Sequence, residues 1–430
     1  MRSGGPGGIG LAKNTSNLFR ERAARARPRL DLSGFNRVLA MDPAAGSVEC
    51  GGMTTYADLA DATLAQGVMP CGVPQLKSIT AGGAAAGVGI ESSSFRHGLV
   101  HETLLAMDVL LADGNVVTCT PVNEHRELFF GLPNSYGTLG YALKLRAKTV
   151  PVKRYVALAH LRHRSAPEYF ADLARHCAGD ADFVDGVVFG ASDMVITLGR
   201  FVDAAPYTSD YTRERIYYRS LRERDSDYLS ALDYLWRWDT DWFWCSKNLG
   251  AQNPLLRRML GRRWLNSVTY SRIMRWNAKW GITRALSRLA GRHSEAVIQD
   301  VDIPLARAPE FLAFLLREIG ILPIWICPVR APDPARVFPL YRLAAPTPFV
   351  NFGFWGAIAG RRGTPPGFHN RAVERKVGEL GGIKSLYSES YFPEAEFRQA
   401  YGGGAYRALK ARYDPQGAFG DLYRKCVLRQ

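Results

Sequence analysis

Residues 79–98 read Ile-Thr-Ala-Gly-Gly-Ala-Ala-Ala-Gly-Val-Gly-Ile-Glu-Ser-Ser-Ser-Phe-Arg-His-Gly. Glycine lacks a Cβ, so a backbone rich in it can approach a ligand closely and adopt positive φ. Its amides can then donate to a phosphate or to the edge of a heterocycle. A Gly/Ser linker is the alternative, but Ile79, Val88 and Ile90 set the glycines in an apolar context. This stretch therefore predicts a cofactor cradle.

The composition narrows the class of protein. The chain has 430 residues, of which 47% are hydrophobic and 22% charged, as is ordinary for a soluble globular protein. Its length predicts two lobes. The net charge of +15 suggests an anionic partner, which could be a phosphate-bearing cofactor, an acidic lipid surface or nucleic acid.

The cysteines and histidines give no sign of a metal site. Seven scattered cysteines form no Cys-x-x-Cys pair, which argues against a disulfide scaffold and fits a reducing compartment. The pairs His97/His101 and His160/His163 are interpreted as packing or surface residues, so no metal is predicted. Neither a transmembrane helix nor a signal peptide is recognisable, which predicts a cytoplasmic protein.

Two motifs precede the glycine-rich stretch. Gly5, Gly7 and Gly10 match the dinucleotide fingerprint, but no strand can precede them, so we reject a Rossmann site. Residues 13–17, Lys-Asn-Thr-Ser-Asn, form a polar cationic loop that suits a pyrophosphate and equally suits a surface turn.

Periodicity and turn residues predict an α+β first lobe. The expected elements are strands at 38–42 and 47–51 around a turn at 43–46, a helix at 56–67, strands at 104–112 and 115–120 around Asp113-Gly114, and an amphipathic strand at 141–151.

A repeated order of elements predicts the second lobe. Strand, helix, strand and strand are expected at 155–161, 167–177, 184–189 and 194–201, and again at 297–303, 308–319, 323–329 and 349–357. A helix at 370–380 and a strand at 383–388 follow. Two such passes predict one antiparallel sheet with helices on a single face.

Residues 203–293 lie between the two passes and have a different composition. Seven of the nine tryptophans fall there, and residues 251–292 hold ten Lys/Arg and no acidic residue. This composition is typical of an interfacial membrane helix and can also bind nucleic acid. A helical insertion with core tryptophans and solvated arginines is the alternative that stays open.

The glycine-serine run, with residues 111–114 (Leu-Ala-Asp-Gly), 118–121 (Thr-Cys-Thr-Pro) and 137–140 (Gly-Thr-Leu-Gly), resembles the FAD-binding domain of the vanillyl-alcohol-oxidase (PCMH) type. More narrowly, it resembles the sterol delta-24 reductase branch. Segments at 322–328 and 386–391 are also similar to this branch and extend the resemblance over nearly the whole chain.

The resemblance implies an α+β, two-lobed flavoprotein. Residues 1–150 would form the FAD domain, with its N-terminal strand-helix-strand unit missing. Residues 151–390 would form an antiparallel-sheet cap carrying the basic, Trp-rich insertion 203–293. Residues 391–430 would return to the FAD domain. The anchoring helix of eukaryotic sterol reductases is absent, so any membrane contact would be peripheral.

The resemblance also implies the cofactor residues. FAD would be non-covalent, because the 14–17 loop has no histidine. Glu91 and His97 would be structural partners of the flavin edge. The full implied set is Thr15, Ser16, Asn17, Gly82, Gly83, Gly87, Gly89, Ile90, Glu91, Ser92, Ser93, Ser94, His97, Gly98, Gly137, Thr138 and Gly140.

The implied reaction is reduction of an isolated C=C bond in a sterol-like or isoprenoid lipid, with NADPH as electron donor. A protein acid must protonate one alkene carbon. Tyrosine is protonated at neutral pH by default, whereas a carboxyl must be buried. Tyr387, Glu389 and Tyr391 would share one face of a strand, and we predict Tyr391 or Glu389 as the donor.

Two alternatives remain at this point. One is an alcohol or aldonolactone oxidase or dehydrogenase of the same fold. The other is a flavin-less protein that associates with membranes. Partners expected on the main interpretation are an apolar small molecule and an anionic membrane surface touched peripherally, with no nucleic acid.

Overall fold

Residues 38–151 build a first, antiparallel sheet. A computed structural model describes residues 8–13, 19–20, 28–212, 215–280, 294–344, 346–359 and 364–430 of the chain. The strand order is β3 (Val38–Asp42), β4 (Ser47–Gly51), β8 (Tyr141–Pro151), β6 (Leu104–Leu110) and β7 (Val116–Cys119), and β5 (Val68–Pro70) also pairs with β8. Both predicted hairpins are present, and Gly114 has the positive φ, 95°, that its turn requires.

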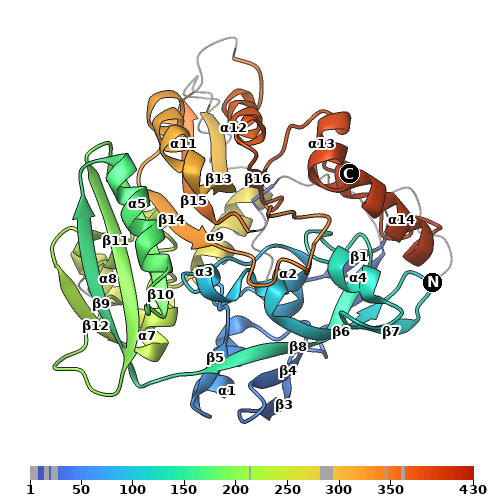
Figure 1. Cartoon of the computed structure of the whole chain (residues 1–430), viewed down its shortest axis with the longest axis horizontal. Coiled ribbons are helices and arrows are strands. Elements are labelled where there is room, and N and C mark those ends of the chain that lie inside the picture. The colour runs from blue at the N-terminus through green and yellow to red at the C-terminus, as the bar shows by residue number, and fades with distance from the viewer. Residues whose placement is uncertain are drawn as a thin grey trace.

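Short helices connect the strands of this sheet. They are α1 (Tyr56–Leu64), α2 (Ala81–Ala86), α3 (Ser94–His97), the 3₁₀ turn η1 (Val100–Thr103) and α4 (Arg126–Gly131). The glycine-rich stretch thus begins as a helix, α2, which lies near the centre of the molecule in Figure 1.

A small parallel pair of strands lies beside the first sheet. β1 (Gly10–Ala12) pairs with β2 (Arg29–Asp31), on either side of the polar cationic loop. A strand therefore directly precedes that loop. Thr15, Ser16 and Asn17 lie outside the described residues.

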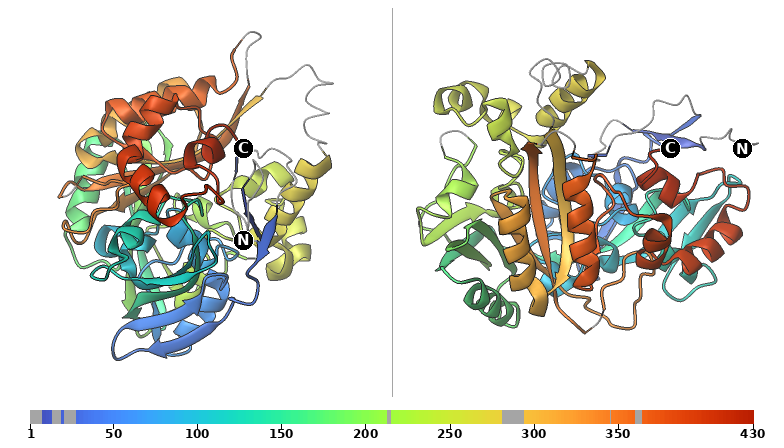
Figure 2. Two further views of the ribbon diagram at one scale, coloured as in Figure 1. Left: turned by 90° about the vertical axis from the view of Figure 1, so that its right-hand side faces the viewer. Right: turned by 90° about the horizontal axis from the view of Figure 1, so that it is seen from above.

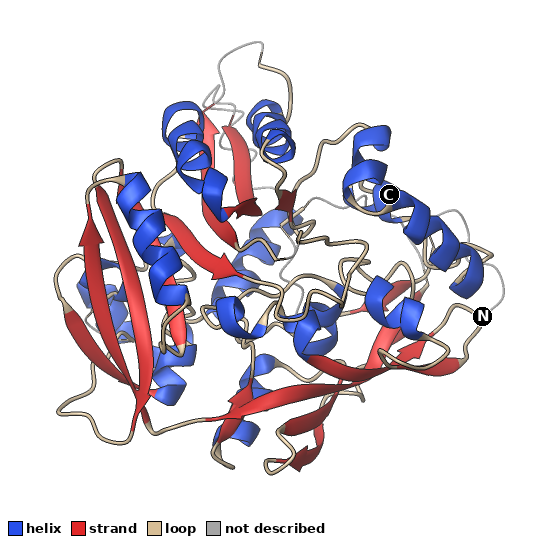
Figure 3. Ribbon diagram, viewed as in Figure 1, coloured by secondary structure: helices blue, strands red, loops and turns tan. Residues whose placement is uncertain are grey.

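The second sheet has eight antiparallel strands. Their order is β12 (Ser226–Ser230), β9 (Tyr155–His163), β11 (Asp193–Val202), β10 (Phe183–Gly190), β14 (Ile324–Val329), β15 (Phe349–Ala359), β13 (Ser294–Pro304) and β16 (Ile383–Lys384). One face is covered by α5 (Ala166–Cys177), α11 (Ala308–Phe314, with η3, Leu305–Arg307, before it and a π turn, η4, Leu315–Ile319, after it) and α12 (Phe368–Glu379). Figures 1 and 3 show these helices in front of the strands, as the repeated order predicts.

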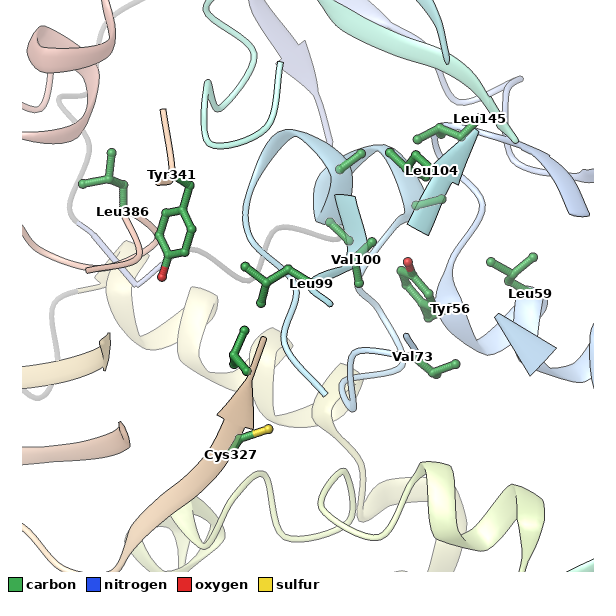
Figure 4. Packing of buried hydrophobic residues seen from close by; sticks show 14 of the residues in the cluster. Tyr56, Leu59, Val73, Leu99, Val100, Leu104, Leu145, Cys327, Tyr341 and Leu386 are labelled. Carbon is green, nitrogen blue, oxygen red and sulfur yellow. The ribbon is translucent and has the colours of Figure 1, made fainter. Parts of the chain in front are cut away.

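Both faces of the second sheet are buried because alternate strand residues enter different cores. Val184 and Val188 of β10 pack under the helices, whereas Phe183 and Val187 join the core that includes the first sheet. Figure 4 shows that shared core running from Leu59 and Leu145 to Cys327 on β14. The face that turns away from the helices is therefore held against the glycine-rich stretch.

The segment 203–293 differs from the expected helical insertion. It contributes the edge strand β12 as well as α6 (Tyr217–Ser220), α7 (Ala231–Leu235), η2 (Cys245–Leu249), α8 (Pro254–Trp264) and α9 (Ser267–Trp280). Its tryptophans divide into two groups. Trp236, Trp238, Trp242 and Trp244 are buried, whereas Trp264 and Trp276 are exposed. Figure 2 shows α8 and α9 on the side opposite to α5, α11 and α12.

The C-terminal residues pack beside the first sheet as helices α13 (Glu394–Ala400), α14 (Gly403–Tyr413) and α15 (Leu422–Cys426). Lys410 donates to the carbonyl oxygen of Thr138 at 2.7 Å. The predicted strand 383–388 was too long: only Ile383 and Lys384 pair with β13, and 386–388 form a turn. Within the described residues, no helix is both long and apolar enough to cross a membrane.

Candidate active site

A cavity of about 350 Å³ lies between the glycine-rich stretch and the second sheet. Small-molecule sites usually measure roughly 300 to 1,000 Å³. The cavity is lined by most of residues 79–90, by the loop that leads into β8, and by residues of β13, β14 and β15. Trp242, Phe243 and Tyr387 complete the lining on the side of the second sheet.

The glycine-rich stretch forms one wall. Thr80 caps α2, its side-chain oxygen accepting from the amide of Gly83 at 3.2 Å. Glycine is required at 82, because a Cβ there would lie 2.8 Å from the carbonyl oxygen of Gly52 in the first sheet. Gly137, which also lines the cavity, has a φ of 77°. This wall is mostly backbone, which a flat or phosphorylated ligand can approach closely.

Two lysines bring positive charge to the cavity. Lys13 donates to the Thr80 hydroxyl at 2.7 Å, and Lys425 donates to the carbonyl oxygen of Tyr136 at 2.6 Å. They come from nearly opposite ends of the chain. Ammonium groups next to backbone amides favour a phosphate-bearing ligand.

Aromatic side chains form the wall opposite to the glycines. The ring of Phe243 lies 4.8 Å from that of Trp355 and 5.3 Å from that of Trp325. Trp242 and Phe243 both have a φ of 46°, a left-handed conformation that bulky residues adopt at a cost of roughly 1–3 kcal/mol each. The packing of these rings holds that conformation and presents an apolar surface to a ligand.

A carboxyl and a phenol also line the cavity. Asp300 on β13 is partly buried and lines the cavity. Burial raises the pKa of Asp300 to about 7, although a hydrogen bond from Tyr387 acts to lower it. The Tyr387 hydroxyl accepts from the indole N–H of Trp355 at 2.9 Å. The site therefore holds a carboxyl that is part-protonated at neutral pH.

Comparison with known proteins decides the class. A family model described as an FAD binding domain matches residues 14–120. The Delta(24)-sterol reductase of Homo sapiens is 27% identical over 371 residues, which cover 82% of this chain and 69% of the human protein. That of Pisum sativum is 23% identical over 448 residues, covering 92% of this chain and 76% of the pea protein. Cytokinin dehydrogenase 7 of Oryza sativa subsp. japonica is 30% identical over 150 residues, covering 34% of this chain and 28% of that protein.

The chain is an FAD-binding oxidoreductase that resembles the sterol delta-24 reductase branch. This confirms the family resemblance and the α+β class expected from the sequence. The residues that line the cavity of this flavoprotein fit the cofactor. The crowded glycine wall leaves backbone facing the cavity, and Lys13 and Lys425 bring two cations to the lining, as suits a ligand with phosphate groups.

The cavity contains part of the predicted cofactor set. It is lined by Gly82, Gly83, Gly87, Gly89, Ile90, Gly137 and Gly140. Thr138 is buried near this wall, but its hydroxyl donates to the carbonyl oxygen of Ser135 at 2.8 Å and does not line the cavity. Thr15, Ser16 and Asn17 lie outside the described residues.

The second half of the glycine-serine run joins the two sheets. Glu91, Ser92, Ser93, Ser94, His97 and Gly98 do not line the cavity. The Ser93 hydroxyl donates to the carbonyl oxygen of Cys71 at 2.7 Å. The amide of Val184 on β10 donates to the carbonyl oxygen of Ser92 at 2.8 Å. A Cβ at Gly98 would lie 2.5 Å from the Glu102 carboxylate. These contacts support a structural role rather than contact with the cofactor.

The predicted catalytic residues are divided by the structure. Tyr387 lines the cavity, whereas Glu389 and Tyr391 do not. Glu389 forms an ion pair with Arg429, which also donates to the Tyr391 hydroxyl at 3.1 Å. Residues 387–388 lie in a turn, and residues 389–391 belong to no helix or strand. The prediction that they share one strand face was therefore wrong, because β16 ends at Lys384.

No group of His, Cys, Asp and Glu side chains in the described part of the chain could hold a metal ion. His101 is buried, its ring 4.5 Å from that of Phe338, and burial lowers its pKa to about 3. His160 makes a 3.1 Å hydrogen bond with the Thr197 hydroxyl. His163 pairs with Asp172 at 2.9 Å.

Sequence reasoning missed Asp300 and the aromatic wall. Asp300 and Asp302 alternate with the apolar residues Val301 and Ile303 in the predicted strand 297–303, and buried polar residues of this kind are informative. Trp325 and Trp355 also stood in predicted strands. Asp300, Trp325 and Trp355 come together only through the order of the strands in the sheet, which no local sequence pattern reveals.

Proposed function

We propose that this flavoprotein reduces an isolated C=C bond of a sterol-like or isoprenoid lipid with electrons from NADPH. The observation that carries the proposal is the aromatic wall, which faces the glycine wall across a cavity that holds a protonatable carboxyl. An apolar alkene suits such a surface. The relatives named Delta(24)-sterol reductase support this substrate class.

FAD, when bound, supplies a carrier that takes hydride from a nicotinamide and passes it to one alkene carbon. The residues proposed to hold it are Lys13, the glycines at 82, 83, 87, 89, 137 and 140, and Lys425. Non-covalent attachment and the use of NADPH are parts of the same proposal. The chain itself must bind the lipid, exclude water, and deliver a proton to the second alkene carbon.

The test is the visible spectrum of the FAD-loaded protein under anaerobic conditions. NADPH should bleach the flavin bands, and a sterol with a side-chain double bond should restore them. The saturated sterol is the matched control and should leave the flavin bleached. Rapid discharge by oxygen, or bleaching by alcohols or sugar lactones, would instead indicate the oxidase or dehydrogenase alternative.

We further propose peripheral contact of a cytoplasmic protein with anionic membranes through α8 and α9. Leu255 and Met259 are 73% and 83% exposed, and Trp276 is 57% exposed. Large apolar side chains at such exposure are costly in water and are typical of an interfacial surface. Exposed arginines accompany them, namely Arg258, Arg262, Arg263 and Arg272.

Changing these four arginines to glutamate should abolish co-sedimentation with vesicles that contain phosphatidylserine. Each basic residue near such a surface contributes about 1 kcal/mol, so wild-type binding should also weaken with salt. A matched variant reverses four exposed arginines elsewhere: Arg37, Arg164, Arg317 and Arg375. If both variants lost binding equally, net charge alone would be responsible and α8 and α9 would not form a docking surface.

A further inference from the structure

Asp300 lies on β13 opposite a residue that has no side chain. Opposite it on β15 stands Gly353. A Cβ at 353 would lie 2.7 Å from Asp300 Oδ1 and 2.7 Å from the Trp355 ring. Only glycine at 353 therefore lets the carboxyl and the indole lie side by side where the sheet meets the cavity.

The hydrogen bonds of Asp300 are incomplete. Tyr387 bonds its carboxyl, but Oδ1 is buried and has no hydrogen-bond partner among the described residues. Burying a charged carboxylate oxygen without a hydrogen-bond donor costs several kcal/mol of folding free energy. A protonated oxygen avoids this cost and can donate to an acceptor in a ligand. The groups that influence its pKa are Tyr387 and Asp302, and neither is a cation.

Asp302, two residues further along the same face of β13, has hydrogen-bond partners for both carboxylate oxygens, unlike Asp300. Its Oδ2 accepts from Tyr341 at 2.8 Å and its Oδ1 accepts from Asn351 at 2.9 Å. Both oxygens are thus satisfied, and Asp302 does not line the cavity. Asp302 fixes the sheet, and its neighbour Asp300 is the carboxyl that a ligand can reach.

The other carboxyls near the cavity are unsuited to proton donation. Glu389 is paired with Arg429 and does not line the cavity. Glu91 has an unpartnered Oε2 but lies in the joint between the sheets, 3.8 Å from Arg237. Asp300 alone among these three lines the cavity.

We infer that Asp300 is the acid that protonates the alkene, with Tyr387 as its positioning residue. The inference rests on the proposed function. As the hydride adds to one alkene carbon, the O–H bond of Asp300 breaks and a C–H bond forms at the other. The alkene is reduced, the nicotinamide is oxidised, and the aspartate left behind recovers its proton from solvent. Tyr387, anchored by Trp355, keeps a hydrogen bond on the carboxyl throughout.

The test separates proton delivery from flavin reduction. Asp300→Asn should leave the bleaching of FAD by NADPH within a few-fold of wild type. Its single-turnover reoxidation by the alkene should fall roughly 10²-fold or more, which is the usual contribution of general acid catalysis. Burial places the pKa of Asp300 at about 7, so wild-type reoxidation should slow as the pH rises through that value. The variant should lose this dependence.

Other titratable groups near Asp300 are Asp302 on the same strand, Tyr387 beyond β16 and Tyr136 before β8. Cys245, Lys13 and Lys425 also line the cavity. The Tyr387→Phe variant tests whether the pH dependence comes from Asp300 or from one of these other groups. The hydrogen bond from Tyr387 acts to lower the pKa of Asp300, so its removal should move the midpoint of the profile to higher pH.

A second readout does not need turnover. The infrared difference spectrum between wild type and Asp300→Asn should show a protonated carboxyl that titrates with the same midpoint. Its absence at pH 6 would overturn the inference. So would a wild-type reoxidation rate in Asp300→Asn, or a loss that occurs in Glu389→Gln instead. If no alkene reoxidises the wild type, the proposed function fails, and the role of Asp300 in it fails too.

Discussion

Neighbouring residues of one type have different roles in this molecule. Asp300 and Asp302 share one face of β13, yet only Asp302 has both carboxylate oxygens hydrogen-bonded. Burial raises the pKa of Asp302 to about 6 and that of Asp300 to about 7. The difference in role comes from what the opposite strand supplies: an amide at Asn351 and no side chain at Gly353.

Asp300 should reduce stability at alkaline pH. Its pKa rises from 3.8 in the unfolded chain to about 7 in the folded one. Between these values the folded state binds more protons, so the free energy of unfolding decreases as the pH rises from about 4 to 7. Asp300→Asn should therefore be more stable than wild type at pH 8, by about 1–3 kcal/mol. At pH 4 the two should be similar.

Urea denaturation of FAD-saturated protein at both pH values measures this difference. Asp61→Asn, at an exposed position of α1, is the matched control and should show no such pH-dependent gain. An Asp300→Asn variant that is less stable than wild type at pH 8 would contradict the expected cost of ionising Asp300.

Some residues of the site are recognisable in the sequence and others are not. The glycines at 82, 83, 87 and 89 were recognisable because a backbone wall needs residues without a Cβ. Tyr387 was predicted because residues 386–391 resemble a segment of the sterol delta-24 reductase branch. Asp300 was missed because its meaning depends on Gly353, which is more than fifty positions away and adjacent only through the sheet.

Among the elements, the joint between the two sheets depends on a buried arginine. Arg237 follows α7, lies 2.8 Å from the Asp185 carboxylate on β10, and lies 3.8 Å from Glu91 in the glycine-serine run. Its guanidinium also lies 3.9 Å from the centre of the Tyr234 ring. Burial raises the pKa of Glu91, while Arg237 acts to lower it. One cation thus stabilises contacts among three separate elements.

Arg237→Met should destabilise the protein by about 3–5 kcal/mol, because it leaves two buried carboxylates without their cation. The triple variant that adds Asp185→Asn and Glu91→Gln should recover much of this loss. Chemical denaturation of all three proteins measures the effect. If the triple variant were as unstable as the single one, packing around Arg237 would matter more than charge.

Elements with local signals were predictable. The hairpins at 43–46 and 113–114 carry their own turn residues, and α5 and α12 carry their own apolar periodicity. The expected strand 383–388 failed because edge pairing with β13 covers only two of its residues. The strand β12 was missed because it is half of a pair whose partner, β9, lies some seventy positions earlier.

Segments near the two ends of the described chain meet beside the cavity. The amide of Phe19 donates to the carbonyl oxygen of Tyr387 at 3.0 Å, and the Arg20 guanidinium donates to Cys426 Sγ at 2.8 Å. The division of the chain near residues 150 and 390 stays a prediction. The first sheet ends at Pro151 and the second begins at Tyr155, which supports the first of these boundaries.

Lys425→Met should weaken FAD binding, because a cation that lines the cavity and donates to the Tyr136 carbonyl oxygen is lost. A hydrogen bond from a charged group contributes about 1.5–3 kcal/mol, so Kd should rise roughly 10- to 100-fold. Arg424→Met removes the neighbouring exposed cation and is the matched control. Flavin fluorescence titration of apoprotein checks both, and equal weakening in the two variants would point to overall charge instead.

The meeting of the two ends has a consequence for biosynthesis. Arg20 and Cys426 are 406 positions apart, so the contact between them can form only after all the residues that separate them have been synthesised. At earlier stages of synthesis the glycine wall is present without Tyr387, Lys425 and α15. If these residues hold FAD as proposed, cofactor capture should follow the synthesis of residues 422–426. A chain that stops before α15 should therefore contain both sheets but bind FAD more weakly than the chain described here.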